Sequence, residues 1–474
     1  MKYPLIYLIL FSTIASAQAP LRLPAIISDH AVLQQSANVK LWGWGPGSNQ
    51  IAIIGSWNKT DTVFAKVGAD FTWETTIKTP KGGNESYEIA FLCKKQKLTV
   101  KDILLGEVWL CGGQSNMEYS FNWGGVSDVG DPQKAFTNNE QIRFFKVALS
   151  YYEKYPQSDC KGEWKVCNST TAKDFSSVGY FFGKNLQEVL KAPVGLIGSY
   201  QGGTCIQTWC PKELFDDDIE QQRLNESEPI NGWIPETPSL LYNSMIFPLA
   251  PYSLSGVIWY QGEGNIYNSY KTYSRVFSGM IMSWRKLFKT ALPFYFVQIA
   301  PFSPRKGEKY FIAPNAALLR EQQEATLNIP GTGMVNIGDL VLNDVNDIHP
   351  KTKGGVAKRL ANLALKEVYN INNIQPYFPR FSSYMISKKR FIIKILSIGK
   401  LSCHEKEIKS FQIGGKDNVF HPARAIIDKD GNIVVDSKEE PEPVSVRYCF
   451  TNDQIPNLFD VNGLPLLPFR TDKW

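Results

Sequence analysis

Between about residue 101 and residue 369, short apolar runs alternate with longer stretches of helical periodicity. The apolar runs predict buried strands at residues 103–111, 194–199, 255–260, 294–299 and 334–337. The stretches between and after them predict helices at residues 177–190, 267–288, 316–327 and 354–367. This alternation is typical of an α/β fold, in which helices cover both faces of a mainly parallel sheet. In such a sheet, ligands bind at loops that follow the carboxyl ends of the strands.

Short strand-like runs flank this central segment on both sides. Upstream runs at residues 39–44, 51–54, 71–77 and 87–91 are separated by turn residues and predict an antiparallel β-sandwich. Downstream runs lie at residues 390–396, 408–413, 424–427, 433–435 and 444–450. Because 474 residues exceed what one core supports, we expect separate domains. These are a β-sandwich-like domain at 18–100, a catalytic α/β domain at 101–369 and a small β-rich region at 370–474.

The first residues have the pattern of a secretory signal. Lys2 precedes an apolar run at residues 5–11, and Ala15-Ser16-Ala17 supplies the small residues of a cleavage site. We therefore expect residues 1–17 to be a signal peptide. No later run reaches about 18 apolar residues, so we predict no membrane span. Glycosylation sequons agree with an extracellular or lysosomal glycoprotein and occur at Asn58, Asn84, Asn168 and Asn225.

Eight cysteines suit an oxidising compartment and suggest disulfide bonds. Spacing alone does not determine connectivity, but the candidate pairs are Cys160 with Cys167, Cys205 with Cys210, and Cys403 with Cys449. We predict no metal site, because no paired Cys or His spacing occurs and the chain has only four histidines. The net charge of +6 comes from dispersed lysines and arginines, which argues against nucleic acid as a partner.

The run from Gly106 to Met117 combines a predicted strand, the turn Gly112-Gly113 and Ser115. Alone it has two interpretations: a nucleophilic serine at the edge of the sheet, or a serine that caps an ordinary helix. Three later strands are also followed by polar loops, at residues 200–204, 261–265 and 338–350. All four loops are expected at the same edge of the sheet, and this favours the nucleophile.

Four sequence blocks carry a family resemblance. They are Gly113-Gln114-Ser115-Asn116-Met117, Gly202-Gly203-Thr204, the block at residues 259–265 that ends in Asn265, and Asp347-Ile348-His349-Pro350. Together they resemble the sialate O-acetylesterase family, carbohydrate esterases of the SGNH-hydrolase superfamily, over most of the mature chain. The resemblance implies a serine esterase that removes O-acetyl groups from sialic acids through an acetyl-serine intermediate. It also implies an acetylated carbohydrate substrate and no cofactor.

The resemblance assigns Ser115 as the nucleophile and His349 as its general base, and imidazole suits that role near neutral pH. Many members of the superfamily carry the triad acid three residues before the histidine, where this chain has Asn346. The carboxylate two residues before the histidine is Asp347, and because the block at residues 347–350 resembles the sialate esterase pattern, Asp347 is our choice for the acid. Asp344 and a backbone carbonyl remain alternatives.

An oxyanion hole needs donors that point to the developing negative charge. The resemblance offers the N–H groups of Ser115 and of Gly202 or Gly203, together with the side-chain amide of Asn265. Side chains that either fix loops or contact sugar hydroxyls are Gln114, Asn116, Gln261 and Glu263. Trp209 either lines the sugar site or packs in the core. Gly112 and Gly264 depart from the family, which often has a small hydroxyl residue at these positions.

Two other functions remain open from the sequence. The chain can be an esterase for other acetylated glycans, such as xylan, because nothing in the spacing identifies the sugar. It can also be an inactive carbohydrate-binding glycoprotein, although the presence of Ser115, Asn265 and His349 argues against that. The sequence does not indicate an oligomeric state.

Overall fold

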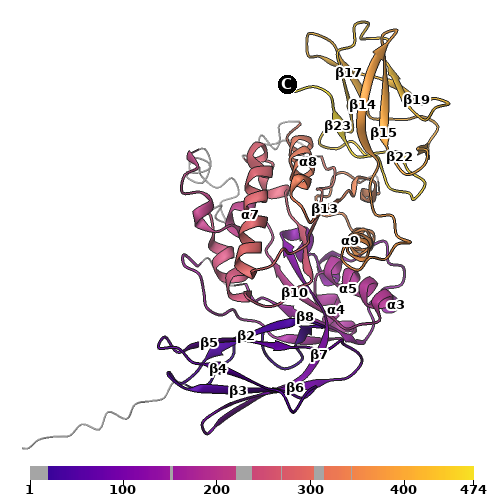
Figure 1. Ribbon diagram of the computed structural model, residues 1–474. Coiled ribbons are helices and arrows are strands. Elements are labelled where there is room, and N and C mark those ends of the chain that lie inside the picture. The colour runs from indigo at the N-terminus through magenta and orange to yellow at the C-terminus, as the bar shows by residue number, and fades with distance from the viewer. Residues whose placement is uncertain are drawn as a thin grey trace, which may run out of the picture.

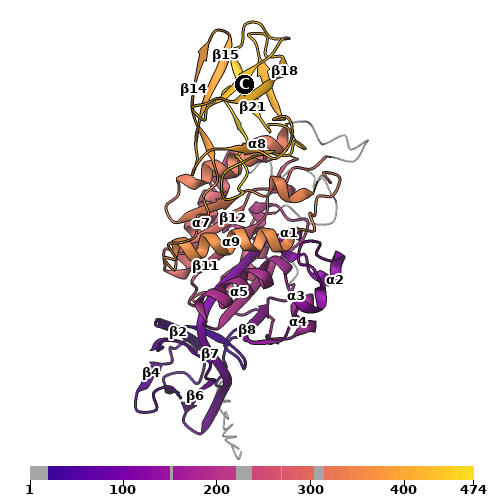
Figure 2. The ribbon, with the colours of Figure 1, turned by 90° about the vertical axis from the view of Figure 1, so that its right-hand side faces the viewer.

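The computed structural model describes residues 20–149, 153–219, 237–267, 269–303, 314–342 and 344–473. The predicted signal peptide and Asn225 lie outside the described residues. An N-terminal β region, a central α/β region and a C-terminal β region follow one another along the molecule (Figure 1). Seen from the side, the helices of the central region lie between the two β regions (Figure 2).

Strand β7 (Gln96–Gly113) occupies the middle of the central sheet, whose order is β13-β12-β11-β7-β10-β8-β9. The other strands are β8 (Asn139–Lys146), β9 (Trp164–Cys167), β10 (Val194–Tyr200), β11 (Gly256–Tyr260), β12 (Phe294–Val297) and β13 (Thr332–Val335). All neighbours are parallel except β9, which runs antiparallel to β8. The predicted α/β class is confirmed. Because later strands add on both sides of β7, the strand order reverses there, and a ligand site is expected beyond its end.

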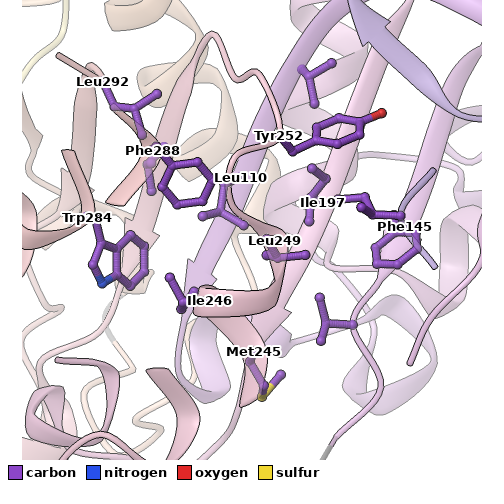
Figure 3. Packing of buried hydrophobic residues seen from close by; sticks show 14 of the residues in the cluster. Leu110, Phe145, Ile197, Met245, Ile246, Leu249, Tyr252, Trp284, Phe288 and Leu292 are labelled. Atoms are coloured by element: carbon purple, nitrogen blue, oxygen red, sulfur yellow. The ribbon is translucent and has the colours of Figure 1, made fainter. Parts of the chain in front are cut away.

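Side chains of β7 alternate between two hydrophobic cores. Val108 and Leu110 enter the core beneath one face, whereas Trp109 and Cys111 enter the core on the other. Figure 3 shows Leu110 in the first core, in the same cluster as Ile197 of β10. Helices α7 (Tyr273–Phe288) and α8 (Asn315–Ala325) supply this core, and α5 (Ser177–Leu190) and α9 (Lys353–Glu367) supply the other. No helix within the described ranges is both long enough and apolar enough to cross a membrane.

The N-terminal region contains two layers of strands. Strand β2 (Asn38–Trp44) pairs with β5 (Thr72–Lys78). In the second layer β3 (Gln50–Gly55) pairs with β4 (Thr62–Lys66) and β6 (Tyr87–Cys93), and β6 pairs with the first half of β7. Strand β1 (Val32–Gln34) runs parallel to the middle of β7. Trp73 and Phe91 join the layers, with ring centroids 5.8 Å apart. The boundary predicted between residues 100 and 101 therefore falls inside one continuous strand.

The C-terminal region has its own core and two antiparallel sheets. One sheet contains β14 (Arg380–Ser387), β15 (Arg390–Leu396), β20 (Ile433–Asp436) and β19 (Arg424–Ile427). The other contains β18 (Phe420–Pro422), β17 (Phe411–Gly414), β21 (Ser445–Tyr448) and β23 (Phe469–Arg470). A two-residue strand β16 (Ser402–Cys403) pairs with β22 (Leu458–Phe459). The small β-rich region expected at this end is present.

The three predicted disulfide pairs are wrong, because none of them is formed. Cys160 and Cys167 belong to different hydrophobic cores, so the sheet separates their side chains. A 3-10 turn at Ile206–Trp209 separates Cys205 from Cys210, and their sulfurs contact the carbonyl oxygens of Gly264 (3.0 Å) and Ile206 (3.3 Å). Cys403 likewise contacts the Glu407 carbonyl at 3.4 Å, while Cys449 is buried.

Candidate active site

The ends of three central strands lie level at one edge of the sheet. Gly113 of β7 is in register with Tyr200 of β10 and Tyr260 of β11. The backbone of Gly113 has a φ of +139°, and a Cβ atom there would lie 2.2 Å from the Tyr260 carbonyl oxygen. Only glycine fits this approach. The chain can therefore turn into the short helix α1 (Ser115–Glu118), which begins at the predicted nucleophile.

Ser115 and His349 meet at this edge although 234 residues separate them. The Oγ atom of Ser115 lies 2.9 Å from Nε2 of His349. Burial lowers the pKa of His349, and the charge of Lys353 lowers it further, while Asp347 opposes both effects. The imidazole is therefore neutral at neutral pH and can accept the serine proton.

Asp347 lies close to the imidazole without a hydrogen bond to it. Its Oδ1 accepts the backbone N–H of His349 at 2.8 Å and lies 3.9 Å from Nδ1 of the ring. Asp344 instead accepts the backbone N–H of Asn346 at 3.1 Å. Among the described residues, no backbone carbonyl accepts a hydrogen bond from Nδ1. Of the three alternatives, Asp347 is thus the group placed to act on the ring, and it does so through its charge.

Two of the expected oxyanion donors are already engaged. Asn265 is fully buried, and its Nδ2 donates to Gln207 (2.9 Å) and Ser269 (2.7 Å), so the amide does not point to the serine as expected. The Gly202 N–H donates to the carboxylate of Glu118 at 2.7 Å. Within the described ranges, the N–H groups of Ser115 and Gly203 have no acceptor. The sequence shows that Asn265 follows the end of a strand, but it does not show in which direction the side chain points.

A buried polar network lies beside the serine. Nδ2 of Asn116 donates to Oε1 of Glu263 (2.6 Å) and to the Ile348 carbonyl oxygen (3.0 Å), and its Oδ1 accepts from Nζ of Lys353 (2.5 Å). Lys353 is fully buried, which lowers its pKa to about 7, although the negative charge of Glu263 acts in the opposite direction. Asn116 therefore ties the serine segment to two other loops. Sequence reasoning missed Lys353, because a lysine at a helix start usually lies in solvent.

Two further motif side chains bind neighbouring loops. Oε1 of Gln114 accepts the N–H groups of Gly262 (3.3 Å) and Gly264 (3.1 Å). Nε2 of Gln261 donates to the Thr204 carbonyl oxygen at 3.1 Å. A Cβ atom on Gly264 would lie 2.6 Å from the Thr204 carbonyl oxygen. The glycine that replaces the hydroxyl residue common in the family therefore allows the two loops to come into contact.

The aromatic residues near the site differ sharply in exposure. Trp209 is fully buried and packs edge-on against Trp259, with ring centroids 5.8 Å apart. It therefore belongs to the core and not to a sugar site. Trp123 is 52% exposed, stacks on Tyr119 and lies 5.4 Å from the His349 ring, centroid to centroid. Sequence reasoning missed Trp123, because a single tryptophan forms no periodic pattern.

Residues 105–366 match the family described as "Carbohydrate esterase, sialic acid-specific acetylesterase". This span is more than half of the chain and contains every site residue described above. The chain belongs to this family. Membership in the sialic acid-specific acetylesterase family makes the protein a carboxylic ester hydrolase.

Relatives of this esterase extend the similarity beyond the central region. Sialate O-acetylesterase from Homo sapiens is 27% identical over 500 residues, covering 96% of this chain and 93% of its own length. The Rattus norvegicus enzyme of the same name is 26% identical over 455 residues, covering 83% and 82%. A carbohydrate acetylesterase from Xanthomonas citri, known from its crystal structure, is 34% identical with a TM-score of 0.84. That match covers 96% of this chain and all of the solved chain, so both flanking β regions belong to the shared architecture.

Proposed function

We propose that this protein removes O-acetyl groups from sialic acids through an acetyl intermediate on Ser115. The observation that carries the proposal is the 2.9 Å contact between Ser115 Oγ and His349 Nε2 at the carboxyl edge of the sheet. A serine hydroxyl becomes a useful nucleophile only when such a base accepts its proton. Relatives that match most of the chain are sialate O-acetylesterases, which supports the choice of sugar.

In the first half of the reaction, Ser115 Oγ attacks the carbonyl carbon of the acetyl ester while His349 takes the hydroxyl proton. The negative oxygen that forms is bound by the N–H groups of Ser115 and Gly203, the two expected donors without another acceptor among the described residues. When the tetrahedral intermediate collapses, the bond to the sugar oxygen breaks and His349 gives its proton to that oxygen. The sugar leaves with a free hydroxyl, and Ser115 remains acetylated.

In the second half, His349 takes a proton from water, and the resulting hydroxide attacks the acetyl group on Ser115. The bond between the acetyl carbon and Ser115 Oγ then breaks, Oγ takes the proton back from His349, and acetic acid leaves and ionises to acetate. The carboxylate of Asp347 stabilises the imidazolium that forms in each half, because its charge lies 3.9 Å from Nδ1. The lowered pKa of His349 helps the ring return to its neutral form after each transfer.

Acetate release from a panel of esters tests this function. The panel contains O-acetylated sialic acids and acetylated xylo-oligosaccharides, assayed with the wild type and with Ser115→Ala. We expect the highest kcat/KM for a sialic acid ester and a loss of at least about 10³-fold in Ser115→Ala. A clear preference for xylo-oligosaccharides would replace the sialic acid assignment with the xylan alternative. Equal rates for wild type and Ser115→Ala on every ester would leave only the inactive binding protein.

We also propose that the protein is a glycoprotein of the secretory route, extracellular or lysosomal. The signal pattern in residues 1–17 supports this, as do exposed side chains at Asn58, Asn84 and Asn168. At Asn168, Oδ1 accepts two N–H groups at the start of helix α4 (Ser169–Asp174), and Nδ2, the atom that a glycan would modify, donates to no described residue. N-terminal sequencing and glycosidase treatment of protein from eukaryotic cells test the proposal. A mature chain that retains residues 1–17 and shows no mobility change would contradict it.

A further inference from the structure

Trp123 forms the outer layer of an aromatic stack beside the reacting atoms. It lies in helix α2 (Phe121–Gly124), with 52% of the residue exposed. Its ring stacks on that of Tyr119 at a centroid distance of 5.3 Å and an interplanar angle of 29°. Tyr119 is only 4% exposed, and the Lys353 ammonium lies 4.6 Å from its ring centroid. The stack thus runs from a buried cation through a buried phenol ring to a half-exposed indole.

The indole is fixed in position before any ligand binds. Tyr119 supports it from within the protein, and the neighbouring residue Asn122 donates to Asp174 of helix α4. Phe121 packs on the buried Phe136, with ring centroids 4.9 Å apart. A rigid surface of this kind loses little conformational entropy when a ligand covers it.

The stack borders the candidate catalytic pair. The His349 ring lies 5.4 Å from Trp123 and 6.3 Å from Tyr119, centroid to centroid. Since His349 Nε2 contacts Ser115 Oγ, a single imidazole separates the indole from the nucleophile. An acetyl ester bound at Ser115 therefore brings the group that carries the ester toward Trp123.

We propose that the exposed part of Trp123 binds the sugar ring of the substrate and so selects sugar esters over other acetate esters. The assignment rests on the proposed function. A pyranose ring has a face of C–H groups that is apolar, and an indole offers it a flat partner of high electron density. Isolated exposed aromatic residues are common on protein surfaces. Trp123 differs because it is held by a buried stack and lies next to the candidate general base.

The ratio of two kcat/KM values tests this role. One substrate is an O-acetylated sialic acid, and the other is ethyl acetate, which has the same acyl group and no sugar. We expect Trp123→Ala to reduce the sugar-to-ethyl acetate ratio about tenfold, mainly through KM for the sugar ester. Trp123→Phe should recover most of the ratio. Phe64→Ala, at a 55% exposed aromatic residue of the N-terminal region, is the matched control and should leave both values unchanged.

Equal losses on both esters would overturn the proposal, since Trp123 would then act by holding His349. An unchanged ratio would also overturn it. Binding without turnover gives a second measurement: calorimetry of Ser115→Ala and of Ser115→Ala/Trp123→Ala with the O-acetylated sialic acid. We expect about tenfold weaker binding in the double variant, and equal affinities would contradict the role. A failure of the proposed function itself gives a different result. The wild type would then hydrolyse ethyl acetate but not the sialic acid ester, and Ser115→Ala would not bind that ester. This result would contradict both proposals.

Discussion

The ammonium group of Lys353 lies 2.5 Å from Oδ1 of Asn116, in a position without solvent exposure. Asn116 follows the nucleophile, and its amide nitrogen binds the carbonyl of Ile348, the residue before His349. The buried cation is thus one hydrogen-bonded residue away from both segments of the candidate catalytic pair. Its charge favours the neutral form of the imidazole, which is the form that a general base needs.

Replacing Lys353 with Met should move the acid limb of the kcat/KM profile to higher pH. In the wild type, burial and the charge of Lys353 both lower the pKa of His349, so we expect the limb at a lower pH than for an ordinary histidine. Lys353, with a pKa of about 7, is charged where His349 titrates, so its removal raises the pKa of His349. Profiles on ethyl acetate measure the shift. Lys351→Met removes an exposed lysine from the same segment and should leave the limb in place. An unmoved limb in Lys353→Met would refute the coupling.

Lys353 should also make stability depend on pH. Its pKa is about 7 in the folded protein, well below the ordinary lysine value of about 10.4 that it has in the unfolded chain. Between these values the unfolded chain holds more protons, so the contribution of this group to the free energy of unfolding rises with pH. Glu263, Asp347 and Asp128 surround the ammonium and limit the effect. The Tm of the wild type minus the Tm of Lys353→Met should therefore increase from pH 7 to pH 10. Parallel Tm curves for the two proteins would contradict this expectation.

Asp347→Asn should reduce kcat/KM only mildly, although Asp347 lies beside the general base. Asparagine still accepts the backbone N–H of His349, and the ring has no hydrogen bond with Asp347 to lose. We expect a decrease in kcat/KM of less than about 100-fold at pH 8, against about 10⁴-fold where the acid is bonded to the ring. Because Asp347 raises the pKa of His349, the acid limb should move to lower pH. Asp344→Asn is the control, and it should leave the acid limb in place. A 10⁴-fold loss would mean that the carboxylate binds Nδ1 during the reaction.

Asn265→Ala should lower the free energy of unfolding more clearly than it lowers kcat. The substitution leaves Gln207, Ser269 and the Ile206 N–H without their buried partner. Each unsatisfied group costs about 1–3 kcal/mol, so we expect the free energy of unfolding to fall by at least about 2 kcal/mol. Urea unfolding measures the loss, with Asn58→Ala as an exposed control. Full stability combined with a 100-fold lower kcat would restore Asn265 as an oxyanion donor.

The strands and the family were predictable because they depend on local patterns. Helix α5 has the predicted bounds, and the strands that carry the site loops differ from prediction mainly at their ends. Strand β8 was missed, because its apolar residues form only a short run that Arg143 interrupts. The role of a buried polar group depends on which direction it faces. Asn265 stands at the expected strand end, yet its amide faces Gln207 and Ser269.

Other parts of the site depend on contacts between distant segments. Lys353 and Asn116 are 237 residues apart, and nothing near either residue indicates that they meet. The exposure of Trp123 and the burial of Trp209 likewise follow from the packing around them, since both tryptophans have a mixture of polar and apolar neighbours in the sequence. The two separate cores that hold Cys160 and Cys167 are equally invisible in their spacing.

Strand β7 has 18 residues and spans roughly 60 Å. Its first half pairs with β6, and its last residues pair with β10 and β11 and lead into the serine turn. Because fraying of either half withdraws support from the other, we expect the N-terminal β region and the catalytic sheet to unfold as one cooperative unit. Truncation at residue 100 would remove the partner strands β1 and β6 and uncover the buried side chains of Ile103, Leu104 and Leu105. The N-terminal β region is thus part of the esterase itself and not a module that can be removed from it.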